Sequence, residues 1–97
     1  MNNTLRIAAV LVFIAAPAAA IPRCAAHADM RAALSDGYGE VLQSLALDGS
    51  GRVVETYANH ETGTWTVALT PPGRPTCVVA SGVGYQPVEQ PAPGEPT

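Results

Sequence analysis

The residues in this sequence that are most able to do chemistry are two cysteines and two histidines. Cys24 and Cys77 are the only cysteines, and His27 and His60 are the only histidines. In an oxidising compartment an even number of cysteines indicates pairing, and two cysteines allow a single pairing. We therefore expect a Cys24–Cys77 disulfide, whose loop of about 53 residues contributes about 4 kcal/mol in the chain-entropy model. Two buried free thiols are the alternative.

A metal site or a general base is expected to use one of the histidines. His60 and Glu61 begin like the helical zinc-protease motif, but a threonine stands where the second histidine is required, and the local sequence indicates a turn. A site that combines these two residues with His27 and Asp29 would need a helix start to approach this turn. Asp29 also points away from His27 on a helix. We expect two solvated histidines and no metal.

No serine in the sequence has a visible catalytic partner. The G-x-S-x-G pattern of hydrolases is absent around Ser35, Ser44, Ser50 and Ser81. Three glutamates could supply an acid–base pair, but nothing in their spacing requires one; they are Glu40, Glu55 and Glu61. The sequence therefore predicts no catalytic residue and no cofactor.

The first 20 residues have the pattern of a secretory signal peptide. A short polar start with Arg6 precedes the apolar run Ile7–Ala16, and Pro17 and the small residues Ala18–Ala20 follow. The apolar run is shorter than the about 20 residues that span a bilayer. We predict cleavage near Ala20 and export to the periplasm or the medium, with an uncleaved membrane anchor as the alternative.

The chain that remains after cleavage is small and acidic. Four arginines against eight acidic residues leave a net charge of −4, and there is no lysine. Nucleic acids and anionic membranes are bound by clustered basic side chains, so we expect neither as a partner. The remaining candidates are another exported protein or a second copy of the chain.

The residues after the leader predict one helix followed by four strands. The alanine-rich segment Cys24–Ser35 places Met30 and Leu34 four residues apart, and Gly37 follows as a left-handed cap. Turn signals separate strands expected over 40–48, 52–58, 64–70 and 76–83. Short connections favour an antiparallel meander. The predicted fold is α+β over residues 21–85, with one N-terminal helix on a four-stranded sheet and a disordered, proline-rich tail over 86–97.

The clearest alternation in the sequence lies in the third of these strands. Trp65, Val67 and Leu69 share one side, which we expect to lie under the helix with Trp65 as the core anchor. The other side is small and uncharged, and we interpret it as a candidate partner surface; it consists of Thr64, Thr66, Ala68 and Thr70. A plain solvated threonine face is the alternative.

The order of these features resembles a group of short, exported, uncharacterised bacterial proteins. The matching pieces, over about 24–82, are the leader, the early cysteine, Tyr38-Gly39-Glu40, Gly63-Thr64-Trp65-Thr66 and Thr76-Cys77-Val78-Val79-Ala80. The resemblance implies export and this order of elements, and no activity. The architecture also resembles small inhibitor-type periplasmic domains, which does not imply their function.

Three hypotheses about function follow. The first is a non-catalytic exported interaction module. The second is an inhibitor or modulator of an envelope or secreted hydrolase that presents the turn at Asn59–Gly63 or at Pro71–Pro75. The third, which the motifs favour least, is a small enzyme or metal binder.

Overall fold

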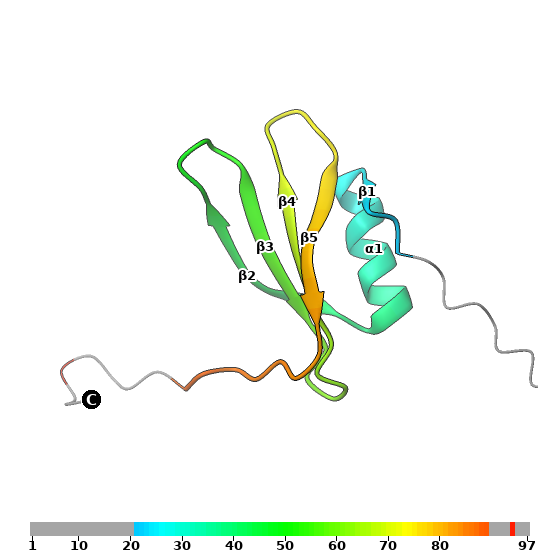
Figure 1. Ribbon diagram of the computed structural model, residues 1–97, viewed down its shortest axis with the longest axis vertical. Coiled ribbons are helices and arrows are strands. Elements are labelled where there is room, and N and C mark those ends of the chain that lie inside the picture. The colour runs from blue at the N-terminus through cyan, green and yellow to red at the C-terminus, as the bar shows by residue number, and fades with distance from the viewer. Residues whose placement is uncertain (1–20, 90–93, 95–97) are drawn as a thin grey trace, which may run out of the picture.

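The computed structural model describes residues 21–89 and 94. Its elements follow one another as β1 (Cys24–Ala25), α1 (His27–Tyr38), β2 (Val41–Leu47), β3 (Val53–Ala58), β4 (Trp65–Thr70) and β5 (Thr76–Gly82). Together they form an α+β domain in which α1 packs on one face of an antiparallel sheet (Figure 1). The predicted signal peptide, residues 1–20, and most of the proline-rich tail lie outside the described residues. Within the described part, no helix is long and apolar enough to cross a membrane.

The sheet contains five strands in the order β1-β5-β4-β3-β2. The predicted meander of four strands is present as β2 to β5, and β1 is the strand that the prediction missed. In β1, Cys24 lies opposite Cys77 and Ala25 lies opposite Thr76. The helix is consequently the second element, so the expectation of an N-terminal helix was wrong. A strand of two residues has no periodicity that the sequence could reveal, and it forms only because β5 lies beside it.

Cys24 and Cys77 form the expected disulfide, which joins β1 to β5. Cys77 pairs with Leu69 of β4, whose side chain points away from α1, so the bridge lies on the face opposite the helix. The bridge therefore holds the strand that leads into the helix and not the helix itself. Only Ala26 separates β1 from α1, so this strand determines where the helix begins.

The helix occupies His27–Tyr38 and not the predicted Cys24–Ser35. Gly37, the predicted cap, lies inside the helix, and Gly39 is the cap, with a left-handed φ of 62°. A side chain at position 39 would collide with Asn59, whose amide donates a hydrogen bond of 2.9 Å to the carbonyl of Tyr38. The helix therefore ends where the turn between β3 and β4 reaches it, and this contact is not visible in the sequence.

The core lies between α1 and the sheet. Met30 and Leu34 are fully buried, as predicted, and they pack with Tyr57 and Ala68. The expected orientation of β4 was wrong, because Ala68 and Thr66 are the residues buried beneath the helix. Their small side chains leave room for the larger side chains of α1 to approach the sheet.

Trp65 lies on the opposite face of the sheet, near its end. Its ring packs on Gly82, where an added Cβ would lie only 2.9 Å from a ring carbon. Its indole N–H donates a hydrogen bond of 3.2 Å to the carbonyl of Val83. Trp65 therefore covers the end of β5 and is not the anchor of the helix-side core.

We expect the Cys24→Ala, Cys77→Ala double variant to lose about 2–5 kcal/mol of unfolding free energy, because the bridge closes a loop with a sequence separation of 53. Urea unfolding of the oxidised protein and of the variant measures this difference. Reduction of the unmodified protein should lower its midpoint similarly, and equal midpoints for all three samples would contradict the prediction.

Candidate functional site

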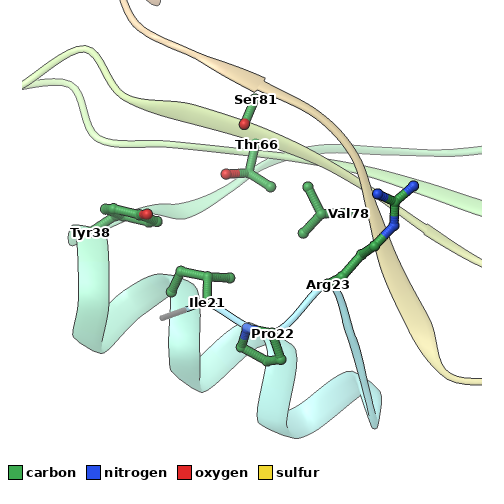
Figure 2. A pocket seen from close by; sticks show the side chains of 7 residues that line it. All are labelled: Ile21, Pro22, Arg23, Tyr38, Thr66, Val78 and Ser81. Carbon is green, nitrogen blue, oxygen red and sulfur yellow. The ribbon is translucent and has the colours of Figure 1, made fainter. Parts of the chain in front are cut away.

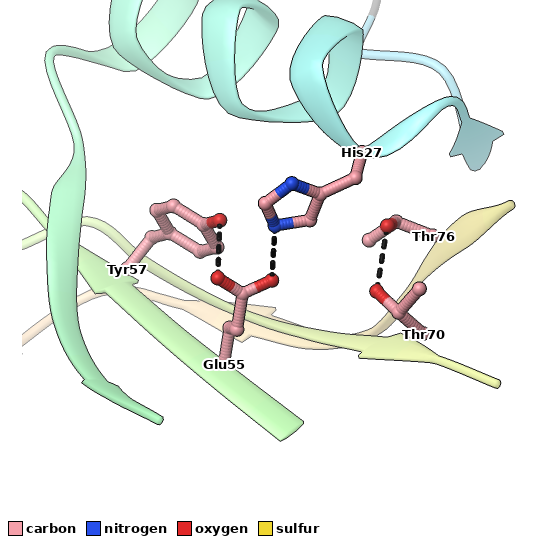
Figure 3. Close-up of polar contacts among 5 residues, drawn as sticks. All are labelled: His27, Glu55, Tyr57, Thr70 and Thr76. Carbon is pink, nitrogen blue, oxygen red and sulfur yellow. Dashed lines mark hydrogen bonds and ion pairs between the residues drawn. The ribbon is translucent and has the colours of Figure 1, made fainter. Parts of the chain in front are cut away.

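A buried carboxylate lies between α1 and the sheet. Glu55, on β3, is only 1% exposed. Its Oε1 lies 2.7 Å from His27 Nε2 at the start of α1, and its Oε2 accepts a hydrogen bond of 3.0 Å from the hydroxyl of Tyr57 (Figure 3). Both oxygens are therefore paired, as a buried carboxylate requires. Glu55 lies beneath the helix because Val53, Glu55 and Tyr57 alternate on the same side of β3.

Tyr57 is held as a neutral hydrogen-bond donor. Burial, the hydrogen bond to Glu55 and the charge of that carboxylate, in decreasing order of effect, together raise the pKa of its hydroxyl to about 12. The positive charge of Arg31 opposes this shift. Tyr57 accordingly remains protonated at neutral pH.

The His27–Glu55 pair resembles the base and orienting acid of a catalytic triad, but the rest of a triad is not assembled around it. Among the described residues, no serine or threonine hydroxyl is hydrogen-bonded to His27. The two threonine hydroxyls drawn in Figure 3, those of Thr70 and Thr76, are 2.6 Å apart and are hydrogen-bonded to each other. The geometry therefore supports a structural role, in which His27 and Tyr57 neutralise the polarity of Glu55 and hold the start of α1 on the sheet.

A groove runs between α1 and β2 beside this cluster. One cavity in it, of about 350 Å³, has apolar walls with His27, Arg31 and Glu55 among its lining residues, which also include Leu42, Leu45, Val53 and Thr70. A smaller cavity of about 210 Å³ shares Arg31 and Leu42 and contains the buried Glu40. The Oε1 atom of Glu40 has no hydrogen-bond partner. The groove could accept an apolar chain, but its polar groups do not converge on one reacting position.

A further cavity of about 390 Å³ lies where the segment before β1 crosses the sheet. It is lined by Ile21, Pro22, Arg23, Tyr38, Thr66, Val78 and Ser81 (Figure 2). Its hydroxyls come from three different elements, and Arg23 is its only charged side chain. Ile21 also packs against the core cluster, so this space is largely a gap beside the core. It contains no acid–base pair.

The two histidines lie in separate places. His60 Nε2 is 2.6 Å from Gln43 Oε1, and its ring packs edge-on against Tyr85 with the centroids 5.6 Å apart. We had expected His27 to be solvated, but its ring is paired with Glu55. Within residues 21–89, no group of three or more histidine, cysteine, aspartate or glutamate side chains is arranged to hold a metal ion.

The candidate partner surface does not lie where the sequence placed it. Thr66 and Ala68, the two central members of this set, are buried under α1, so they do not form an open face with Thr64 and Thr70. Their strand neighbours lie on the other side, which no described helix covers (Figure 1). We name this side the helix-free face; it is formed by Val54, Thr56, Trp65, Val67 and Leu69, flanked by Val41, Ser44, Ala46 and Ala80.

None of these nine side chains is charged, and most are apolar. In an antiparallel sheet that is covered on one side, the open side is usually polar. The helix-free face departs from that pattern. Sequence reasoning missed it because the alternation in β4 does not reveal which side the helix covers. It also missed the burial of Glu55, because the alternation of Val53, Glu55 and Tyr57 on one side of β3 does not show whether that side faces the helix.

Comparison with family models, with curated proteins and with solved structures finds no match. The function therefore has to be argued from the residues themselves.

We expect His27→Ala to lower the unfolding free energy by about 1–3 kcal/mol, because it leaves one oxygen of the buried Glu55 without a partner. Urea unfolding at neutral pH measures the effect. His60→Ala is the matched control, since its contact to Gln43 is exposed, and it should change stability by less than about 0.5 kcal/mol. Equal losses of unfolding free energy in the two variants would contradict a stabilising role for the buried His27–Glu55 contact.

We also expect a step in stability at high pH that depends on Tyr57. The pKa of Tyr57 in the folded protein is about 12, whereas the ordinary pKa of a tyrosine hydroxyl is 10.0. The corresponding stabilisation is complete below pH 10 and is lost as the pH rises from 10 towards 12. Urea midpoints across this range should fall more steeply for the unmodified protein than for Tyr57→Phe. The exposed Tyr38→Phe variant should keep the steep fall.

Proposed function

We propose that this protein is a non-catalytic, exported interaction module whose partner binds the helix-free face. Export is supported by the leader-like residues 1–20 and is compatible with the Cys24–Cys77 disulfide, since disulfides persist in oxidising compartments. The site supports a binding role over catalysis, because the His27–Glu55 pair has no hydroxyl nucleophile bonded to it among the described residues.

The observation that carries the proposal is the absence of charge on the helix-free face. Val54, Val67 and Leu69 lie side by side on adjacent strands and are half-buried, with no helix above them in the described part of the chain. Soluble monomers rarely expose contiguous apolar surface of this kind without using it. Burial of such a surface against a partner releases about 25 cal/mol per Å² of apolar area.

A second candidate function is the inhibitor or modulator of an exported hydrolase. It is favoured by the rigidity of the Asn59–Gly63 turn, in which Asn59 Oδ1 accepts hydrogen bonds from the backbone of Glu61 and Thr62 at 2.9 and 3.1 Å. A rigid loop loses little entropy on binding. This function requires that Glu61→Arg weaken partner binding, whereas the module proposed above requires the same change to leave it intact.

Site-specific photo-crosslinking in the exported protein tests the proposal. A photoreactive residue in place of Thr56, at the centre of the helix-free face, should yield a discrete adduct after irradiation of intact cells. The matched control replaces Ala32, which is exposed on α1, and should yield no such adduct. Adding Val67→Lys should lower the yield at position 56 about tenfold or more, because it places a charge in an apolar contact. Equal yields at positions 56 and 32, or none at either, would refute the proposed face.

A further inference from the structure

Strand β2 is the long open edge of the sheet. The opposite edge is β1, which has two residues, whereas β2 has seven, none of them charged and none of them proline. Leu45 and Leu47 on this strand are 59% and 68% exposed. Natural edge strands are normally protected by charge, proline or shortness, so this edge lacks the usual obstacles to pairing.

The hairpin between β2 and β3 determines which backbone groups of β2 point outward. The N–H of Asp48 donates to the carbonyl of Arg52 at 3.0 Å, so these two residues form a hydrogen-bonded pair. Hydrogen-bonded and non-hydrogen-bonded pairs alternate along antiparallel strands. Counting back from Asp48, Leu47 and Leu45 belong to non-hydrogen-bonded pairs with β3. Their N–H and C=O groups therefore point away from β3, towards the open edge.

The first part of β2 is not available to pair with another strand. The register with β3 shifts between Leu42 and Ser44, and Gln43 lies at this bulge. The side-chain amide of Gln43 donates to the Val41 carbonyl at 2.9 Å. Only Ser44–Leu47 remains available to another strand, and it offers four outward backbone groups, two from Leu45 and two from Leu47.

We propose that β2 pairs antiparallel with β2 of a second copy, about a twofold axis at Ala46. In this register Leu45 of each copy lies opposite Leu47 of the other, and both pairs are hydrogen-bonded. The two pairs use all four outward groups of each copy. The contact is self-complementary, as a twofold interface requires, and it joins the two sheets into one. It goes beyond the proposed function, because it uses the edge of the sheet and not the helix-free face.

The absence of charge on the paired segment, together with its self-complementary backbone groups, favours a second copy as the occupant. The paired segment is uncharged, so two copies of this acidic chain meet there without a like-charge pair. With the axis at Ala46, Asp48 of each copy lies opposite Ser44 of the other, and the carboxylate of Asp48 is already paired with Arg52 of its own chain. Leu45 and Leu47 face the side of the helix, so the leucines of the two copies would cover one another there.

A register-specific cross-link tests the proposal in the full exported protein. Ala46 lies opposite Ala46 of the second copy in a non-hydrogen-bonded pair, where the side chains are closest. Ala46→Cys should therefore form an intermolecular disulfide on mild oxidation, with the native bridge confirmed by peptide mapping. Ser44→Cys is the matched control on the same face of the same strand, and it should cross-link at least about tenfold less.

Sedimentation of the unmodified protein over a range of concentrations should show a monomer–dimer equilibrium. Leu47→Pro should abolish it while leaving the fold intact by circular dichroism, because the N–H that it removes points outward and not to β3. Val83→Lys, at an equally exposed apolar position away from β2, should leave it unchanged. A monomer at every concentration, a dimer that survives Leu47→Pro, or equal cross-linking through positions 44 and 46 would overturn the proposal. After any of these three outcomes, a photo-crosslinked adduct between position 56 and a different protein would still support the proposed function.

Discussion

The disulfide between Cys24 and Cys77 joins a strand of two residues to the last strand of the sheet, and the position of the helix depends on it. Only Ala26 lies between β1 and α1, so the helix must begin at the β1–β5 edge, the edge furthest from β2. Without this bond, β1 would be held on the sheet by the pairing of only two of its residues, Cys24 and Ala25, with β5. The bond therefore helps to determine which face of the sheet is covered and which edge is left open.

In the part of the chain that the structure describes, one helix of 12 residues covers a sheet of five strands. Met30 and Leu34 cover Ala68 and Tyr57, but the leucines towards the end of β2 remain exposed. The helix-free face and the β2 edge both result from this shortage of covering elements. A small domain that cannot bury all its apolar surface within one chain has a physical reason to bind another one.

The cluster of His27, Glu55 and Tyr57 shows how a group with catalytic residue types can have a structural role. Glu55 is buried because it occupies a helix-facing position on β3, and its charge requires partners there. His27 supplies one from the first residue of α1, and Tyr57 supplies the other from the same strand. The same contacts that satisfy the acid also hold the helix against the sheet.

Local patterns in the sequence determined the strands of the meander, the buried pair Met30 and Leu34, and the pairing of the two cysteines. These features depend on periodicity or on there being a single possible partner, and both can be read along the chain. Only the tertiary structure decided that Trp65 lies away from the helix, that Gly39 and not Gly37 ends it, and that Glu55 is buried. The large apolar side of β4 and its small, uncharged side can each lie under a helix, and the side that becomes the core is set by where the helix packs. That position depends on contacts between residues distant in sequence, Cys24 with Cys77 and Asn59 with Tyr38, which no local pattern contains.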